Sequence, residues 1–513
     1  MERYFNITGC CNPVNHYMVN LDSRLAQIKK MVDRGQYFCI NKGRQYGKTT
    51  TLSALENYLK DDYVVLSMDF QLQMSSAKFV TEQAFVKGFA EAFVETISFT
   101  SEYELCSADD FKDVNDMVGL FRKLSFICSK SRLPIVMFID EVDQASNNQV
   151  FLDFLAQLRG YYLKRNKCAT FQSVILAGVH DIRNLRQKIR PDSEHKHNSP
   201  WNIATPFEVD LSFSADDISG MLTEYENDNH TGMNIPKISQ LIYDYTSGYP
   251  VLVSNICKLS DEKVGWNNTS ISEAVKIILK DNSPLFESLI NKIEDNRDLY
   301  DYLYQILIEG RRVSYNPDDS IIKLAIMYGF VKEENGAVKI ANRIFETRLY
   351  NAILTSKQMQ QTSIFKAGEL EKPQFINGNE LNMPLILEKF IQHFNDIYGS
   401  QPDKFKEDDG RKLFLLYLRP IINGIGNYYI EAQTRDMRRT DVIVDYCGKQ
   451  YIIELKIWRG EEYNTQGEQQ LCEYLDYYHI DTGYLLSFNF NKNKQTGMRT
   501  HNINGRTIIE GII

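Results

Sequence analysis

The stretch GRQYGKT at residues 43–49 decides the fold of the N-terminal part of this chain. It follows a β-rich run at 37–40 and leads into a segment in which Leu52, Leu55 and Leu59 recur at helical spacing. A strand, a glycine-containing loop and a helix in this order direct backbone N–H groups at an anion, because the N-terminus of the helix faces the loop. The sequence therefore predicts a site for the phosphates of a nucleotide.

Each residue type in this loop has a chemical role. Gly43 and Gly47 give the backbone room to approach a phosphate. The ammonium of Lys48 can neutralise the β and γ oxygens, and the hydroxyl of Thr49 can bind Mg²⁺. The first glycine of the usual spacing falls at Lys42, so we expect Gly43, one place later, to supply the tight turn. The predicted cofactors are ATP and Mg²⁺.

A pair of acids is expected beside this loop. Residues 135–139 are five consecutive apolar residues, typical of a buried parallel strand, and Asp140 and Glu141 follow directly. We expect Asp140 to hold the metal and Glu141 to orient or deprotonate the attacking water. The alternative is an ordinary strand that happens to end in acids. The residues predicted to bind the nucleotide and its metal are Gly43, Gly47, Lys48, Thr49, Thr50 and Asp140.

The order of β-rich and amphipathic runs predicts an α/β core at 1–212, a parallel sheet covered by helices. Its strands are expected at 37–40, 63–70, 135–139, 174–178 and 207–211. Helical spacing then predicts a helical lid at 213–281. At 282–354, helical runs precede two short β runs around Asn335-Gly336, a hairpin signal that is typical of a winged helix.

Residues 355–383 are rich in Gln, Lys, Glu and Asn and predict a linker. A separate, smaller α/β domain is expected at 384–513. Its elements are predicted in the order helix 385–397, helix 411–422, strands 428–433, 441–446 and 451–458, helix 468–478 and strand 483–488.

Three charged residues stand out in this last domain. Asp441 begins one strand, and Glu454 and Lys456 lie two apart in the next, so the latter two share a face. Burying an acid and an amine in so apolar a strand costs free energy unless they are paired or bind something. One hypothesis is a buried salt bridge. The other is that Asp441 and Glu454 hold Mg²⁺ while Lys456 orients or activates water that attacks a phosphodiester.

Composition sets outer limits on function. The chain has 513 residues, too many for one ordinary core, and its net charge of -9 gives no global attraction to nucleic acid. Its apolar runs all fall short of a membrane span, and the first residues do not resemble a signal peptide, which predicts a cytoplasmic protein. The nine cysteines include no CxxC pair, so neither a disulfide framework nor a zinc site is indicated.

The motifs at residues 1–355 resemble those of AAA-like or STAND-like P-loop ATPases. The resemblance rests on residues 43–50, on Phe138-Ile139-Asp140-Glu141 and on Ser247-Gly248-Tyr249-Pro250. It implies an ATP-driven switch, often a regulatory one.

Residues 384–490 resemble the PD-(D/E)XK nuclease superfamily, with Asp441 as the first acid and Glu454-Leu455-Lys456 as the second motif. This resemblance implies a restriction-endonuclease-like fold and a nucleic-acid partner, and we expect that partner to be DNA. It also implies roles for Gln470 and Tyr474, the QxxxY pattern of one branch, and for Glu388, where an extra metal-binding acid often lies. Thr440 replaces the proline that usually precedes the first acid.

The expected function is therefore a regulatory ATPase coupled to a Mg²⁺-dependent nuclease, by family analogy in defence against mobile elements. Two alternatives stay open. In one, the ATP state switches nucleic-acid or protein binding and the nuclease fold is not catalytic. In the other, the chain is a motor or assembly ATPase without a nucleic-acid partner. Assembly into a homo-oligomer is compatible with each, and no membrane partner is expected.

Overall fold

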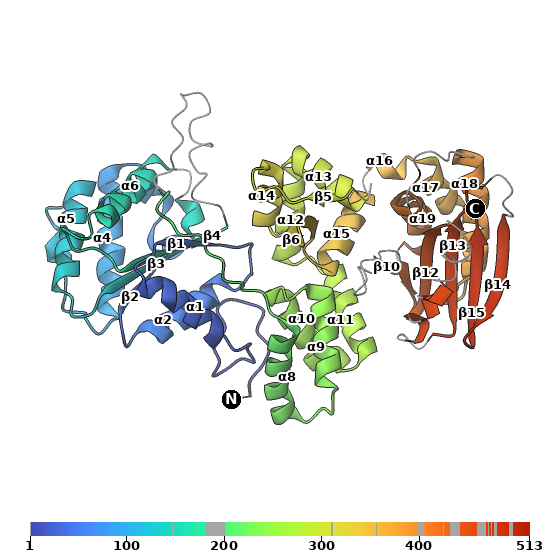
Figure 1. Ribbon diagram of the computed structural model, residues 1–513, viewed down its shortest axis with the longest axis horizontal. Helices are drawn as coiled ribbons and strands as arrows, with labels where there is room; N and C mark the ends of the chain where they lie inside the picture. Colours follow the sequence, from blue (N-terminus) through green and yellow to red (C-terminus); the bar gives the residue numbers. More distant parts are fainter. Residues whose placement is uncertain are drawn as a thin grey trace. The chain divides into compact units, whose positions relative to one another are not determined.

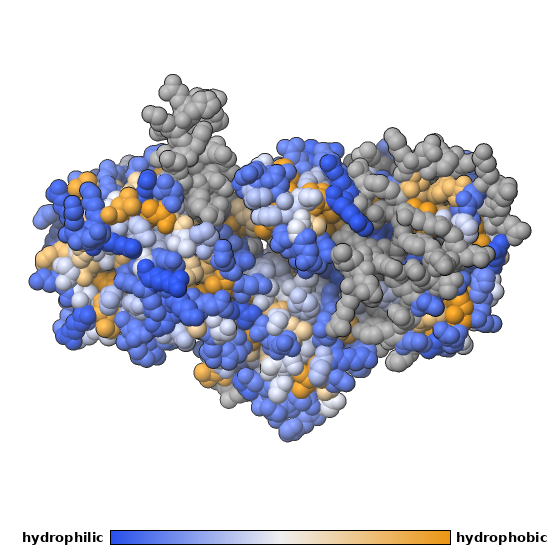
Figure 2. All heavy atoms as spheres, in the orientation of Figure 1, coloured by the Kyte–Doolittle hydropathy of each residue, from blue (hydrophilic) through white to orange (hydrophobic). Residues whose placement is uncertain are grey.

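The structure is a computed structural model, which describes residues 2–145, 148–179, 201–308, 311–354, 357–398, 405, 407–423, 425–430, 442–458, 468–469, 471–472, 474–476, 480–491 and 496–513. The chain divides into two compact units, Met1–Ala274 with Ile326–Gly329, and Val275–Ala325 with Phe330–Ile513. Among the described residues, no helix has the length and apolar character that crossing a membrane requires. In Figure 2, hydrophobic residues appear on the visible face only in scattered spots.

The first unit is built on a parallel sheet. Its strands are β1 (Phe38–Asn41), β2 (Val64–Asp69), β3 (Ile135–Asp140) and β4 (Ser173–Gly178), in the order β1-β4-β3-β2. These four strands confirm the sequence prediction, but the strand expected at 207–211 is wrong. The chain runs there without strand pairing, and only Thr205 bridges to Phe38. Val209 and Leu211 are nevertheless buried against the core, and this burial produces the alternating pattern that suggested a strand.

Helices cover both faces of this sheet (Figure 1). One face packs against α1 (Asp22–Asp33) and α2 (Lys48–Leu59), and the other against α4 (Glu82–Ser98), α5 (Met117–Lys130) and α6 (Gln149–Leu163). In β3, Phe138 faces the hydrophobic cluster with α1 and α2, whereas Met137 and Ile139 face the cluster with α4, α5 and α6. Burial on both faces explains why β3 is apolar at every position before its terminal acid.

Short elements and a helical region complete the first unit. The short elements are α3 (Phe70–Gln73), η1 (Ser76–Phe79), η2 (Ala108–Phe111) and η3 (Val142–Gln144). The helical region contains α8 (Ala215–Asn229), α9 (Ile235–Thr246), α10 (Pro250–Leu259), η5 (Ser260–Val264) and the start of α11 (Asn268–Lys280), whose residues from Val275 onward belong to the second unit. Residues 4–21, here called the N-terminal arm, pack on α8, where the Tyr17 ring lies 5.1 Å from that of Tyr225.

The second unit begins with helices and a small sheet. These elements are α12 (Pro284–Glu294), α13 (Arg297–Leu307), β5 (Val313–Ser314), α14 (Ser320–Met327), β6 (Val331–Glu334), β7 (Ala337–Ile340) and α15 (Arg343–Leu354). The strands form an antiparallel sheet in the order β5-β7-β6. The predicted hairpin is confirmed, because Asn335 and Gly336 join β6 to β7 with φ of 54° and 76°, as a type I′ turn requires.

The stretch 355–383 was expected to lack regular structure, and this expectation is wrong. It contains α16 (Lys357–Gln360), α17 (Ser363–Phe375) and a hairpin of β8 (Ile376–Asn377) and β9 (Glu380–Leu381). A Cβ atom at Gly368 would collide with the backbone oxygen of Tyr417 on α19 (Glu407–Ile422), so α17 packs closely on that helix. Only three residues of α17 are buried, Ile364, Gly368 and Phe375. The apolar periodicity is therefore too weak for the helix to be predicted from the sequence.

The C-terminal part is a mixed sheet with helices. Its elements are α18 (Met383–Tyr398), α19 (Glu407–Ile422), β10 (Asn427–Ile430), β11 (Val442–Tyr446), β12 (Lys449–Ile457), β13 (Thr482–Phe488), β14 (Gly497–Ile503) and β15 (Arg506–Ile512). The order is β10-β11-β12-β13-β15-β14, with parallel pairing on both sides of β13 and antiparallel pairing elsewhere. The α/β class predicted for this region is confirmed.

The two faces of this sheet differ. Gly511 faces α18, since a Cβ atom there would lie 2.9 Å from Ile391. On the opposite face, Leu471 and Leu475 pack against Ile452 and neighbouring strand residues. Because side chains alternate along a strand, Glu454 and Lys456 lie on the face that carries Ile452.

Candidate functional site

The predicted phosphate loop connects β1 to α2. Gly47, with φ of 79°, caps the N-terminus of α2, and Gln45 also has a left-handed backbone with φ of 56°. Gly43 is not among the residues with positive φ, so the expectation that it supplies the tight turn is wrong. Gly43 instead allows close packing, because a Cβ atom there would lie 3.3 Å from the Tyr249 hydroxyl and 3.4 Å from the Tyr328 carbonyl oxygen.

Lys48 lies inside this loop with a side chain that is almost fully buried. Its ammonium donates hydrogen bonds to the carbonyl oxygens of Lys42 and Gly43, at 3.1 and 3.0 Å. Burial lowers the pKa of Lys48, and the nearby carboxylates of Glu141 and Asp140 act in the opposite direction. A buried cation at the start of a helix, beside backbone N–H groups, is a site that favours an anion.

Thr49 and Asp140 meet at the edge of the sheet. The Thr49 hydroxyl donates to Asp140 Oδ2 at 2.7 Å, and the backbone N–H of Glu141 donates to Asp140 Oδ1 at 2.9 Å. A hydroxyl and a carboxylate side by side are the hard oxygen donors that Mg²⁺ prefers, so these two residues fit that ion. Thr50 has another contact, because its hydroxyl accepts the backbone N–H of Cys11 at 3.1 Å and so holds the N-terminal arm.

Glu141 follows Asp140 in a left-handed conformation with φ of 53°. Burial raises the pKa of Glu141, repulsion by Asp140 raises it further, and Lys48 opposes both effects. A carboxyl whose pKa moves toward neutrality is a better match for proton transfer near neutral pH. A third acid, Asp143, lies close by and accepts the backbone N–H of Val179 at 2.6 Å just after β4. Sequence reasoning missed Asp143, although it lies only three residues after Asp140.

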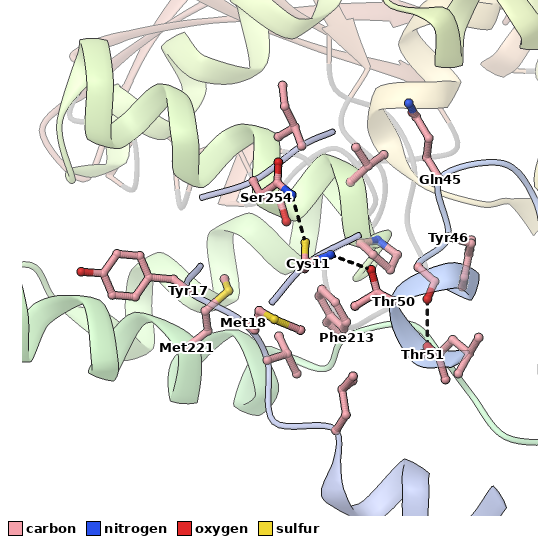
Figure 3. A pocket seen from close by; sticks show the side chains of 18 of the residues that line it. Cys11, Tyr17, Met18, Gln45, Tyr46, Thr50, Thr51, Phe213, Met221 and Ser254 are labelled. Carbon is pink, nitrogen blue, oxygen red and sulfur yellow. Dashed lines mark hydrogen bonds between the residues drawn. The ribbon is translucent and has the colours of Figure 1, made fainter. Parts of the chain in front are cut away.

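A cavity of about 330 Å³ adjoins the loop, in the lower part of the size range of ligand pockets (Figure 3). Its walls come from the N-terminal arm and Arg24 of α1, the phosphate loop and the start of α2, residues 211–213, α8 and α10. Figure 3 shows Tyr17, Met18, Phe213 and Met221 around it, together with the hydrogen bond between Cys11 and Thr50. A mainly apolar cavity beside a phosphate site suits a flat heterocyclic base. The sequence prediction did not include this cavity.

Tyr249 joins the helical region to the phosphate loop. Its hydroxyl donates to the backbone oxygen of Arg44 at 2.6 Å, and its ring packs edge-on against Tyr46 at 4.8 Å. The residues Ser247-Gly248-Tyr249-Pro250 carried part of the family resemblance, and this contact shows what Tyr249 does in the structure. The residue that caps the N-terminus of α10 is therefore in direct contact with the loop.

In the C-terminal sheet, Glu454 and Lys456 form a buried ion pair on β12. The Lys456 ammonium lies 3.2 Å from Glu454 Oε1, and the exposed fractions of the two residues are 5% and 0%. The salt-bridge hypothesis thus describes this state of the molecule, and it is compatible with a role in hydrolysis. Tyr474 is buried in the cluster over this face. Asp441 and Gln470 lie outside the described residues.

Glu388 has a different environment from Glu454. It is exposed on α18, which packs against the opposite face of the sheet. Within the ranges that the structure describes, no three or more His, Cys, Asp and Glu side chains gather as a metal site would require. A metal-binding role for Glu388 stays a prediction.

The parallel sheet, the loop that ends at Gly47, and the acids after β3 define a P-loop nucleotide-binding protein of the α/β class. The chain belongs to the family of AAA-like domains, whose model matches residues 15–351. A second model, that of the PD-(D/E)XK nuclease superfamily, matches residues 425–500. A comparison with curated protein sequences gives no match.

A comparison with solved structures gives several ATPases and related proteins as matches. The Walker-type ATPase of Pyrococcus abyssi is 13% identical, covers 67% of this chain and 99% of its own, and has a TM-score of 0.48. The ORC1 protein of Aeropyrum pernix in complex with DNA is 13% identical over 66% of this chain and 92% of its own, with a TM-score of 0.30. The ADP form of the ORC2 protein of the same organism is 11% identical over 69% and 98%, with a TM-score of 0.36.

Proposed function

We propose that this protein is a regulatory ATPase whose nucleotide state controls a Mg²⁺-dependent nuclease in the same chain. The ATPase half of the proposal is supported by one arrangement: Lys48 and the Thr49–Asp140 pair lie at the N-terminus of α2 beside the cavity. The nuclease half is supported by the buried Glu454 and Lys456 within the segment that matches a nuclease superfamily.

In the ATPase, the protein binds the nucleotide at two places. The cavity takes the base, and the backbone N–H groups at the start of α2 take the phosphates together with Lys48. Thr49 and Asp140 would hold Mg²⁺, which when bound neutralises charge on the phosphates. Glu141 accepts a proton from, or orients, the attacking water, and its half-buried position keeps that carboxyl close to the loop.

The cavity can be tested separately from the phosphate loop. Ser254 lines the cavity on α10, so Ser254→Trp should fill it and lower the affinity for ATP and ADP at least about tenfold, a loss of roughly 1.4 kcal/mol. Inorganic tripolyphosphate, which lacks a base, should bind as before. Calorimetric titration of both ligands measures the difference. Lys258→Trp, on the same helix but outside the cavity, is the control. Equal loss of ATP and tripolyphosphate binding would contradict this assignment.

Glu141→Gln should separate binding from hydrolysis. The amide keeps the shape of the side chain but cannot take a proton, so we expect ATP to bind normally and to turn over about 10² to 10⁴ times more slowly. Phosphate release under single-turnover conditions and nucleotide titration measure the two properties. The corresponding acid-to-amide substitution at the neighbouring acid, Asp143→Asn, tests whether Asp143 has this role instead. Unchanged turnover in Glu141→Gln with a large loss in Asp143→Asn would transfer the role to Asp143.

In the nuclease, the substrate is the phosphodiester backbone of a nucleic acid, with DNA as the first candidate. Glu454 would hold Mg²⁺ together with Asp441, and the metal when bound polarises the phosphate and favours ionisation of water. Lys456, held beside Glu454 by the ion pair, orients the water for in-line attack. Gln470 and Tyr474 would support this site, and the helices and β5-β7-β6 sheet at 282–354 would act as a winged helix that contacts DNA.

A second candidate function is a nucleotide-switched binding protein in which the nuclease fold does not cleave. The Glu454–Lys456 ion pair favours it, because Lys456 gives the Glu454 carboxylate an opposite charge from within the protein. Incubation of the purified protein with circular DNA, linear DNA and RNA, with and without Mg²⁺, separates the two. Mg²⁺-dependent cleavage that disappears on chelation supports the nuclease. Binding without cleavage of any of these substrates supports the switch.

A further inference from the structure

A second polar network lies on the same face of the C-terminal sheet as Glu454 and Lys456. Glu510 on β15, with an exposed fraction of 2%, accepts a hydrogen bond from the Ser487 hydroxyl of β13 at 2.6 Å. Its other carboxylate oxygen lies 3.3 Å from Nε2 of His501 on β14. Ser487 is fully buried, whereas the His501 side chain is about one third exposed. The network therefore extends from the core to the surface.

Strand register ties this network to the proposed cleavage site. Lys456 pairs with Ser487 across the parallel β12–β13 ladder, and Glu454 is in register with Leu485, which in turn is in register with Glu510. Residues in register on neighbouring strands share a face and lie about 4.8 Å apart. Ser487 is thus adjacent to Lys456. The strand that carries His501 is three strand spacings from β12, roughly 14 Å.

The buried carboxylate also determines what the histidine can do. A carboxylate accepts hydrogen bonds and cannot donate them, so the ring donates from Nε2 to Glu510, and Nδ1 is its second functional atom. A protonated ring donates from both nitrogens, to Glu510 through Nε2 and to a further acceptor through Nδ1. The charged groups around it are Glu510, Arg499 in register with Glu510 on the same face, and Glu468, whose pKa is raised mainly by burial.

We propose that His501, oriented by Glu510, binds a backbone phosphate of the nucleic acid in its protonated form, with Nδ1 as the donor, several nucleotides from the phosphate that is cleaved. Each strand of a duplex rises about 3.4 Å per nucleotide along the helix axis, so the spacing of roughly 14 Å between β12 and β14 corresponds to about four nucleotides. Ser487 fixes the Glu510 carboxylate on the side of Lys456, so Glu510 and Ser487 are positioning residues and His501 is the phosphate contact. This inference rests on the proposed nuclease function. It assigns a substrate-binding role to β13, β15 and β14, the strands beyond the Glu454 and Lys456 motif.

The first test is binding in a protein that cannot cleave. In the Glu454→Gln background, the affinity for a fluorescein-labelled 20-nucleotide DNA, single-stranded and duplex, is measured by anisotropy at several salt concentrations. His501→Ala should weaken binding about five- to tenfold. It should also reduce the magnitude of the slope of log K against log salt concentration by about 0.7 to 0.9, the change expected when one phosphate contact is lost. His501→Lys should restore both values. His393→Ala is the matched control, because His393 also pairs with a glutamate, Glu371 at 3.1 Å, but lies on α18.

The second test is kinetic and uses protein with an intact Glu454. Glu510→Gln should raise KM for the same DNA severalfold and leave kcat nearly unchanged, because the cleavage site itself is intact. A network with only a structural role would lower the melting temperature and leave the salt slope of His501→Ala at the parent value, and this result overturns the inference. If the parent cleaves DNA and the His501 variants bind as it does, only the inference fails. If the parent neither binds nor cleaves DNA, the inference and the proposed nuclease function both fail.

Discussion

Lys48→Ala is expected to lower the affinity for ATP by at least about 100-fold, or roughly 2.7 kcal/mol, and to abolish turnover. The ammonium of Lys48 is the buried cation nearest to the start of α2, and the two carbonyl oxygens that hold it leave it inside the loop. An alanine removes the charge that the β and γ phosphates need in a region that already contains Asp140 and Glu141. Titration with MgATP and a steady-state phosphate assay measure the two effects.

The control for this variant is Lys60→Ala, which removes an exposed lysine at the other end of α2. It should bind and hydrolyse ATP like the parent. The melting temperature of both variants must also be compared, because Lys48 is close to two carboxylates whose repulsion it reduces. Normal ATP affinity in a folded Lys48→Ala protein would show that the loop at 43–49 is not the phosphate site.

Glu454→Gln is expected to eliminate nucleic-acid cleavage while leaving ATP turnover unchanged. The amide keeps the volume of the side chain but removes the charge that would hold Mg²⁺ beside Asp441. Asp441→Ala should have the same effect, and Lys456→Ala should reduce the rate more than the metal affinity. Cleavage of labelled DNA and ATP hydrolysis, followed in the same reaction, show whether the two activities separate.

Stability of the same variants distinguishes a cleavage site from a structural ion pair. Removing either member of the buried pair deprives the other of an opposite charge at 3.2 Å, which typically costs about 3 to 5 kcal/mol. Replacing both, as Glu454→Gln with Lys456→Met, should recover most of that stability but no cleavage. Recovery of cleavage in the double variant would contradict a catalytic role for these residues.

Much of the first site is local in sequence and could therefore be predicted. Gly47, Lys48 and Thr49 are consecutive, and Asp140 follows a strand whose burial on both faces makes it continuously apolar. Parallel strands bring their carboxyl ends to one edge, which explains why Thr49 and Asp140 meet. Glu454 and Lys456 were likewise placed on one face by the period of two in a strand.

The parts that the sequence did not predict depend on contacts between distant segments. The cavity draws its walls from five separate segments, and no local pattern reports on such an assembly. The hydrogen bond of Tyr249 to Arg44 joins residues 205 positions apart. The β14–β15 hairpin did carry a local signal, because Asn504 and Gly505 form its turn with positive φ, as Asn335 and Gly336 do in the hairpin that was predicted. A hairpin predicted from Asn504 and Gly505 would have placed His501 and Glu510 on neighbouring strands.

The central claim is that the nucleotide state controls cleavage, and one measurement tests it most directly. The rate of DNA cleavage by the full chain in Mg²⁺ is measured with ATP, with ADP and without nucleotide, for the parent and for Lys48→Ala. We expect the parent rate to differ at least about tenfold between ATP and no nucleotide, equivalent to roughly 1.4 kcal/mol of coupling, and the Lys48→Ala rate to be the same in all three conditions. Equal rates for the parent in all three conditions would contradict the claim.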